Sequence, residues 1–219
     1  MGFMLLAQQL YRRYARFFNR IPMINQVRNK GNNNIFDLDK PIIRSKIVCL
    51  GNNNKIILMP GGGLDKCSFH ISGDHNTIII GKRSSAIHAS LYIEDSNNSI
   101  EIGDDCSLCG EILLAACEGT SIKIGDEALC SSHIELRTSD SHAIYDTGGR
   151  RINAAKNINI GKHVWIATGV RINKGVVIGD NNVIGNAAVV TKTFTNTNVI
   201  IAGNPAKIIK EEIIWSKER

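Results

Sequence analysis

Residues 158–190 read INIGKHVWIATGVRINKGVVIGDNNVIGNAAVV and repeat with a period of six. The branched residues that mark this period are Ile160, Ile166, Ile172, Ile178, Ile184 and Val190. A period of six is neither the 3.6-residue period of an amphipathic helix nor the alternation of a half-buried strand. It is typical of a triangular coil in which each side is a short strand, each corner is a turn, and one branched side chain per side points inward.

A second, longer period precedes this stretch. Isoleucines recur every 22 residues and then once after 36, at Ile56, Ile78, Ile100, Ile122 and Ile158. Because three six-residue sides make one coil, the first step is interpreted as a coil with a four-residue bulge and the second as two coils. The sequence therefore predicts an all-β fold, a parallel β-helix of stacked coils over residues 31–203. Cys106 and Cys130 fall on inward positions of this count, so we expect them to be buried and reduced.

Composition narrows the class of protein and of partner. The 219 residues fit one domain, and a hydrophobic content of 43% argues against disorder. A net charge of +6 favours an anionic partner, but the basic residues lack interleaved stacking aromatics, which argues against nucleic acid. No apolar run reaches the roughly 20 residues of a membrane span, and no signal peptide is recognisable. We expect a cytoplasmic protein, with the inner face of the membrane as an alternative location.

The two ends of the chain depart from the repeat. Residues 1–30 are predicted to form a basic amphipathic helix and a linker, with an apolar stripe at Phe3, Leu6, Leu10, Tyr14, Phe17 and Ile21. Four arginines lie largely off this stripe: Arg12, Arg13, Arg16 and Arg20. The helix is expected to cap the coil, to pack against a neighbour, or to contact an anionic membrane surface. Residues 204–219 are predicted to form a short helical cap that begins after Pro205.

One stretch inside the repeat breaks the count. Residues 138–156, TSDSHAIYDTGGRRINAAK, are polar and glycine-bearing, so we expect an extruded loop over about 137–157. His142 lies at the start of this loop, in surroundings too polar for a core. A neutral imidazole accepts protons near pH 7, which makes His142 the candidate general base. Asp140 and Glu111 are the candidates for orienting its ring.

Several motifs together resemble one enzyme family. SDSHAIYD at 139–146, HVWIA at 163–167 and IAGNPAKII at 201–209, added to the six-residue period, resemble the hexapeptide-repeat acyltransferases. Within that family the resemblance is nearest to bacterial sialic-acid, polysialic-acid and other sugar O-acetyltransferases. It implies a left-handed β-helix, a homotrimer, and acetyl transfer from acetyl-CoA to a hydroxyl of a sugar or polysaccharide, expected to be anionic, with no metal. It also assigns the base to His142.

The same resemblance assigns two sets of binding residues. Donor contacts are expected at Trp165, Ala167, Thr168, Asn186, Ala187, Thr191, Lys192, Lys207 and Lys210. Acceptor contacts are expected at Tyr145, Arg150, Arg151 and His163. The family usually has Gly where Ala167 stands. Lys207 and Lys210 are expected three positions apart on the predicted C-terminal helix, where they would meet the nucleotide phosphates.

Three alternatives stay open at the level of sequence. An N-acetyltransferase of an amino sugar would use the same fold and the same donor. A metal enzyme like the γ-class carbonic anhydrases would use His70 and His75, which have an H-x₄-H spacing but no third histidine upstream. A non-catalytic coil would only bind sugars or partners, and His142 would then be dispensable.

Overall fold

The structure, a computed structural model, describes residues 24–218 together with residues 10, 13, 14 and 19. The predicted N-terminal helix lies mostly outside the described residues, although Leu10, Arg13 and Tyr14 have helical backbone. The predicted linker is wrong at its end, because Gln26–Lys30 already form the first strand and pair with the next coil. Within the described residues, no helix has the length and apolar character that a membrane crossing needs.

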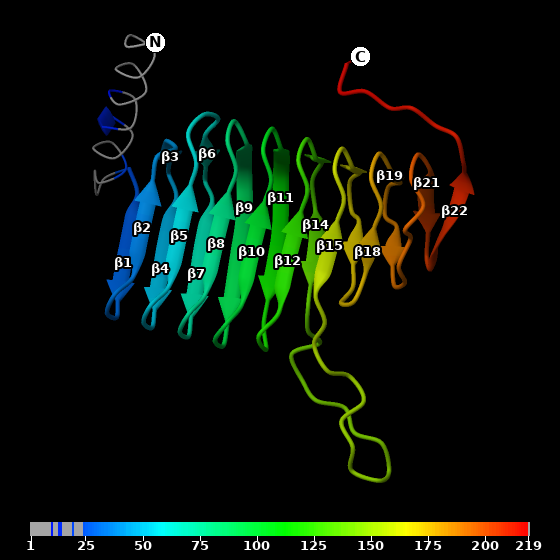
Figure 1. The fold of residues 1–219 in the computed structure, drawn as a ribbon, viewed down its shortest axis with the longest axis horizontal. Coiled ribbons are helices and arrows are strands. Elements are labelled where there is room, and N and C mark those ends of the chain that lie inside the picture. The colour runs from blue at the N-terminus through cyan, green and yellow to red at the C-terminus, as the bar shows by residue number, and fades with distance from the viewer. Residues whose placement is uncertain (1–9, 11–12, 15–18, 20–23, 219) are drawn as a thin grey trace.

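The chain winds into a triangular solenoid whose three sides are parallel ladders of short strands (Figure 1). Side 1 holds β3 (Ile42–Ile43), β6 (Leu64–Asp65), β13 (Leu129–Cys130), β16 (Trp165–Ile166), β19 (Val183–Ile184) and β21 (Ile200–Gly203). Side 2 holds β1 (Gln26–Lys30), β4 (Lys46–Leu50), β7 (Ser68–Ser72), β14 (Ile134–Arg137), β17 (Arg171–Ile172) and β20 (Val189–Val190). Side 3 holds β2 (Ile35–Leu38), β5 (Lys55–Leu58), β8 (Thr77–Ile80), β10 (Ser99–Ile102), β12 (Ser121–Ile124), β15 (Ile158–Ile160) and β18 (Val177–Ile178). Two long strands, β9 (Ser85–Glu94) and β11 (Ser107–Ala116), bend from side 1 into side 2.

The predicted periods are confirmed by strand register. The five isoleucines of the long period lie directly above one another on side 3 and are fully buried: Ile56, Ile78, Ile100, Ile122 and Ile158. Cys106 and Cys130 are buried in the same hydrophobic core, as predicted. The core is therefore a column of branched side chains that each coil extends.

The longer coils place their extra residues on side 2 and at the corner that follows it. An asparagine ladder fills this corner: the backbone N–H of Asn76 donates to Asn54 Oδ1 at 2.9 Å, and that of Asn98 to Asn76 Oδ1 at 2.8 Å. These asparagines are buried, and the carboxamides also donate to backbone carbonyls, so the wide corner is satisfied internally. The four-residue bulge expected from the sequence is thus an ordered polar corner held by hydrogen bonds between successive coils.

The C-terminal prediction is wrong. Residues 206–210 form β22 (Ala206–Lys210), an antiparallel strand that pairs with β21, and no described residue after it is helical. The chain reverses at Gly203, which has a φ of 101°, and Ile208 then packs against the core. The strand wins because it pairs with the exposed edge of the last coil, which a helix would leave unpaired.

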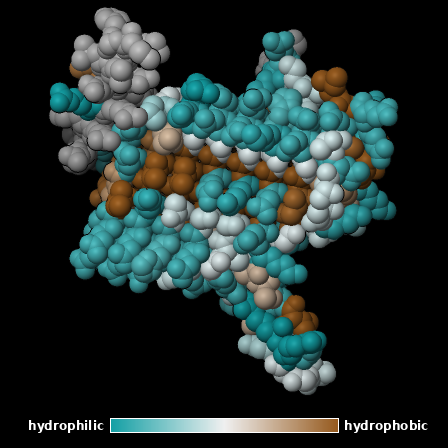
Figure 2. All heavy atoms as spheres, viewed as in Figure 1, coloured by the Kyte–Doolittle hydropathy of each residue, from teal (hydrophilic) through white to brown (hydrophobic). Residues whose placement is uncertain are grey.

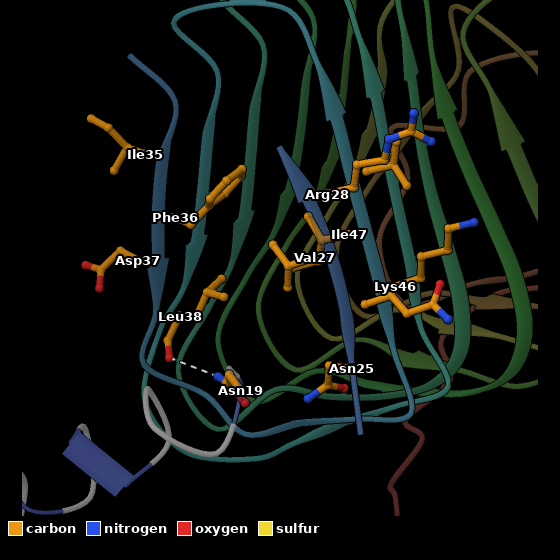
Figure 3. A pocket seen from close by; sticks show the side chains of 12 residues that line it. Asn19, Asn25, Val27, Arg28, Ile35, Phe36, Asp37, Leu38, Lys46 and Ile47 are labelled. Carbon is orange, nitrogen blue, oxygen red and sulfur yellow. Dashed lines mark hydrogen bonds between the residues drawn. The ribbon is translucent and has the colours of Figure 1, made fainter. Parts of the chain in front are cut away.

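Two features project from the solenoid on opposite sides (Figure 1). The loop between β14 and β15 hangs from one side, and the tail after β22 lies on the other. The N-terminal end of the coil opens into a cavity of about 880 Å³, with Val27, Phe36 and Leu38 in its lining (Figure 3). Asn19 closes one edge by donating to the carbonyl oxygens of Leu38 and Lys40.

Candidate active site

The extruded loop is anchored firmly where it leaves the coil. Thr138 is fully buried, its N–H donates to Ala115 O at 3.1 Å, and its carbonyl accepts from Lys156 N at 2.9 Å. Its hydroxyl also hydrogen-bonds Thr120 Oγ1 at 2.6 Å. Both ends of the loop are therefore attached to a rigid corner between sides 2 and 3.

The outer part of the loop is a self-braced hairpin. Ile152 N donates to Ile144 O at 2.9 Å, and Asp146 N donates to Arg150 O at 3.0 Å. The Asp146 carboxylate accepts the backbone N–H groups of Gly148 and Arg150, and Gly149 turns the chain with a φ of 82°. Figure 2 shows apolar residues on this projecting hairpin, and the large ones are exposed: Ile144, Tyr145 and Ile152.

Asn153 links the outgoing and returning segments of the loop. Its Oδ1 accepts from Ile144 N at 2.7 Å, and its Nδ2 donates to His142 O at 2.8 Å and to Asp140 Oδ2 at 2.9 Å. The side chain is buried although the loop is not. Sequence reasoning missed this residue, because an asparagine in a polar loop carries no signal of its partners.

His142 presents a free imidazole. The residue is exposed, its carbonyl is fixed by Asn153, and its ring has no hydrogen-bond partner in the part of the chain that the structure describes. Asp140 does not orient it within one chain: Lys174 Nζ donates to Asp140 Oδ2 at 2.5 Å and lowers the pKa of that carboxyl. The Glu111 carboxylate lies instead 3.0 Å from His133 Nδ1. Both expected orienting carboxylates are thus engaged elsewhere in the chain.

The two arginines of the loop are also paired. Arg151 makes a bidentate pair with Glu118 at 2.5 and 3.0 Å, and Ser139 Oγ donates to the same carboxylate at 2.5 Å. Hydrogen bonds from Arg151 and Ser139 lower the pKa of Glu118 to about 2. Arg150 pairs with Asp146 at 3.2 Å. Their predicted role in holding an anionic acceptor stays a prediction, and their charges are balanced within the chain.

Two small cavities flank the root of the loop. One, of about 360 Å³, is lined by Glu94, Asp95, Cys117, Glu118, Ser139, Ser141, Ala143 and Arg151. The other, of about 290 Å³, is lined by Arg137, Ser139, Asp140, Ser141, Asn173 and Lys174. Ligand pockets are usually roughly 300–1,000 Å³, so each is at or near the lower limit for a small ligand.

The expected donor residues fall into separate groups. Trp165 points outward from side 1 and donates from Nε1 to Ser131 Oγ at 3.4 Å. Thr168 and Ala187 stack at the corner between sides 1 and 2, where Ala187 N donates to Thr168 O at 2.8 Å. Asn186 is exposed beside Ala187, whereas Ala167 is buried, so only its backbone can face a donor.

The remaining donor candidates lie elsewhere. Thr191 and Lys192 follow side 2 at its other corner, and Lys192 Nζ lies 5.4 Å from the Phe194 ring centroid. Lys207 and Lys210 are exposed on β22, opposite Ala202 and Ile200. A strand, unlike the predicted helix, does not bring residues three apart together, so the two lysines do not form the expected adjacent pair.

One chain alone does not bring His142 and Trp165 together. The loop that carries His142 leaves the corner between sides 2 and 3, whereas Trp165 points out from side 1. The loop and the tail, which lies against Trp165, project on opposite sides of the solenoid (Figure 1). A site that uses both residues therefore needs more than one copy of the chain.

Comparison with known proteins agrees with the coiled fold. The family described as "Bacterial transferase hexapeptide (six repeats)" matches residues 157–192. The structure resembles that of the polySia-specific acetyltransferase NeuO, with a TM-score of 0.79 and 31% identity over 89% of this chain and 90% of that one. It equally resembles the polysialic acid O-acetyltransferase OatWY, with a TM-score of 0.78 and 31% identity over 89% of this chain and 91% of that one. The chain belongs to the hexapeptide-repeat acyltransferases. No curated protein sequence matches it.

Membership of the hexapeptide-repeat acyltransferases settles the class of the protein. The fold is the left-handed parallel β-helix of this family, and the chain is an acyltransferase. Among the described residues, no group of three His, Cys, Asp or Glu side chains could hold a metal ion, and His70 stacks on Tyr92 at 5.1 Å. His163 stacks on Trp215, a residue that sequence reasoning missed, and its expected contact with the acceptor stays a prediction.

Proposed function

We propose that the protein transfers an acetyl group from acetyl-CoA to a hydroxyl of a sugar or polysaccharide, with His142 as the general base. One structural observation carries this proposal: an exposed imidazole, with no hydrogen-bond partner among the described residues, is held by its backbone at the root of a braced loop. The family membership supports it, since the two relatives are described as acetyltransferases of polysialic acid. The net charge of +6 favours an anionic acceptor.

In this mechanism His142 accepts one proton and later donates it again. The neutral imidazole accepts the proton of the acceptor hydroxyl as its oxygen attacks the thioester carbonyl. When the tetrahedral intermediate collapses, the carbon–sulfur bond breaks and the imidazolium returns the proton to the departing thiolate. The products are an acetyl ester and a free thiol, and the histidine is again neutral. A base of this kind contributes on the order of 10²–10⁴-fold to the rate.

We place the site between copies of the chain in a homotrimer. The exposed apolar residues of the hairpin, Ile144, Tyr145 and Ile152, favour packing on another copy. The base and Trp165 lie on different sides of one chain. Donor candidates are also divided, because Thr168 and Ala187 lie at the corner between sides 1 and 2, whereas Thr191 and Lys192 lie at the other corner of side 2. A closed threefold assembly would bring the loop of one copy to side 1 of the next and would create three equivalent sites.

The location of the reaction is also a proposal. All six cysteines of the chain lie in the described part and are unpaired, which is typical of a reducing compartment. Contact of the N-terminal arginines with an anionic membrane would bring the enzyme close to newly made polysaccharide. Binding to vesicles with and without anionic lipid, compared for the full chain and an arginine-to-glutamine variant, tests that contact.

The function is tested by acetyl transfer to defined glycans. The purified protein is incubated with acetyl-CoA and a panel of acidic and neutral glycans, free thiol is measured, and products are analysed by mass spectrometry. We expect an acidic glycan to gain ester-linked acetyl groups that mild base removes. Base-stable acetyl on an amino sugar would instead support the N-acetyltransferase alternative, and the absence of any thiol release would contradict the proposal.

A further inference from the structure

The tail after β22 runs back along the corner between sides 3 and 1. Three points on residues 211–218 are tied to the coil by hydrogen bonds: Ile213 N to Asn198 O at 3.0 Å, Trp215 Nε1 to His163 O at 3.0 Å, and Lys217 Nζ to Asp105 O at 2.9 Å. Asn198 Nδ2 also donates to Ile213 O at 3.1 Å. The tail is therefore attached to the side of the solenoid.

The tail is extended between these points. Its first and last anchors lie four coil steps apart, which is about 19 Å at a strand spacing of about 4.8 Å. Four residues of extended chain span about 13–14 Å, and the long Lys217 side chain bridges the remainder. Alternate side chains face the coil, so Trp215 is buried while Ile214 is 94% exposed.

Trp215 makes its contacts at the donor side of the proposed site. Its indole stacks on the His163 imidazole with centroids 4.1 Å apart and planes 9° apart. It also lies 6.0 Å from Trp165, tilted by 41°. Since Trp165 donates to Ser131 Oγ, its ring is held from two directions. The tail thus fixes the one aromatic side chain that the family resemblance places at the donor.

We infer that Trp215 is a positioning residue of the donor site, an inference that rests on the proposed function. It holds Trp165 in one rotamer, so binding of acetyl-CoA does not have to immobilise that ring. Loss of Trp215 releases the ring and weakens donor binding by about 3- to 10-fold. Proton transfer at His142 is on another element, so turnover at saturating donor is unaffected.

Steady-state kinetics distinguish positioning from a merely structural role. Trp215→Ala is expected to raise the KM for acetyl-CoA about 3- to 10-fold and to change kcat less than twofold. Trp215→Phe keeps a stacking ring and should recover most of the affinity. Ile214→Ala, on the outward face of the same tail, is the matched control and should match the wild type. A fall in kcat with KM unchanged, or an unchanged KM in Trp215→Ala, would overturn the inference.

Fluorescence gives a second readout, because Trp165 and Trp215 are the only two tryptophans in the chain. Trp215→Phe leaves Trp165 as the reporter, and Trp165→Phe leaves Trp215. Coenzyme A is expected to quench both reporters, and this measurement holds even if Trp215→Ala fails to fold. A response from Trp165 alone would overturn the inference and leave the proposed function standing. No response from either, with no turnover by the wild type, would overturn both.

Discussion

Removal of the Asn153 side chain should free the extruded loop without unfolding the coil. Asn153→Ala loses four hydrogen bonds: those to Ile144 N, to His142 O, to the Asp140 carboxylate and, at 3.4 Å, to Arg151 Nε. The two backbone bonds are worth about 0.5–1.5 kcal/mol each, and the bond to the carboxylate about 1.5–3 kcal/mol. Because the loop is near water, the freed groups can be hydrated, and we take a local loss of about 2–3 kcal/mol, at or just below the lower end of the sum of these values.

A loss of this size has a measurable consequence. It raises the population of the opened loop by about 30- to 150-fold, since 1.4 kcal/mol is a factor of ten. Trypsin cleaves after Arg150 and Arg151, both in the hairpin, so the rate of cleavage there should rise by that factor. The thermal midpoint of the coil should change by less than a few degrees, because β14 and β15 are anchored below Asn153 by Thr138.

The assay is limited proteolysis followed by mass spectrometry, with acetyl transfer measured on the same samples. Asn196→Ala is the matched control, since Asn196 is exposed and its side chain makes no hydrogen bond within the described residues. We expect turnover to fall at least tenfold in Asn153→Ala and to remain unchanged in the control. Cleavage within twofold of the wild-type rate would refute this account of the loop.

Three further predictions concern the coil and the donor. Burial lowers the pKa of Lys40 to about 8 from 10.5, so the unfolded chain binds more protons than the folded chain between these pH values, and the free energy of unfolding rises with pH there. Any stability advantage of Lys40→Met over the wild type, measured by denaturant unfolding, should therefore shrink by up to about 3 kcal/mol from pH 8 to 10.5. A difference that stays constant over this range would show that Lys40 has an ordinary lysine pKa. Asn76→Ala leaves Asn98 N and Asp95 O unpaired inside the wide corner and should cost about 2–5 kcal/mol in urea unfolding, whereas a cost near that of Asn196→Ala would mean that water replaces the ladder. Lys207→Ala and Lys210→Ala should each raise the KM for acetyl-CoA about 2- to 30-fold at low salt and by less at high salt, with kcat unchanged. An effect that is absent or independent of salt would show that the nucleotide phosphates of the donor bind elsewhere.

The sequence periods correctly predicted which strands stack and which side chains are buried. Every coil repeats the same burial, so the spacing of Ile56, Ile78 and Ile100 alone fixes which strands stack and in which register. The loop was predictable for the converse reason, since a stretch without inward residues cannot form a side of the coil. The C-terminal helix was predicted wrongly because local propensity does not contain the exposed edge of β21, with which residues 206–210 pair.

The site was less predictable than the fold. His142 and the loop could be found from the break, but the partners of Asp140, Glu111 and Arg151 could not, because those contacts join residues from 22 to 34 positions apart. Trp215 reaches His163 across 52 positions, through a tail whose course follows from tertiary contacts alone. The separation of His142 from Trp165 on one chain is visible only in three dimensions, and it motivates the proposal that copies share each site.

Subunit complementation tests whether each site joins His142 of one copy to Trp165 of another. His142→Ala and Trp165→Ala are made separately, then co-expressed with different tags, and the mixed assemblies are purified through both tags and assayed at a donor concentration below the wild-type KM. His142→Ala alone should lose at least about 100-fold in acetyl transfer, and Trp165→Ala alone should lose activity at this donor concentration through weaker donor binding. If copies share each site, every mixed trimer has both residues intact at only one of its three sites, and the purified mixture should regain about one third of wild-type activity. A mixture no more active than its parents, or His142→Ala alone with more than half of wild-type turnover, would contradict the account.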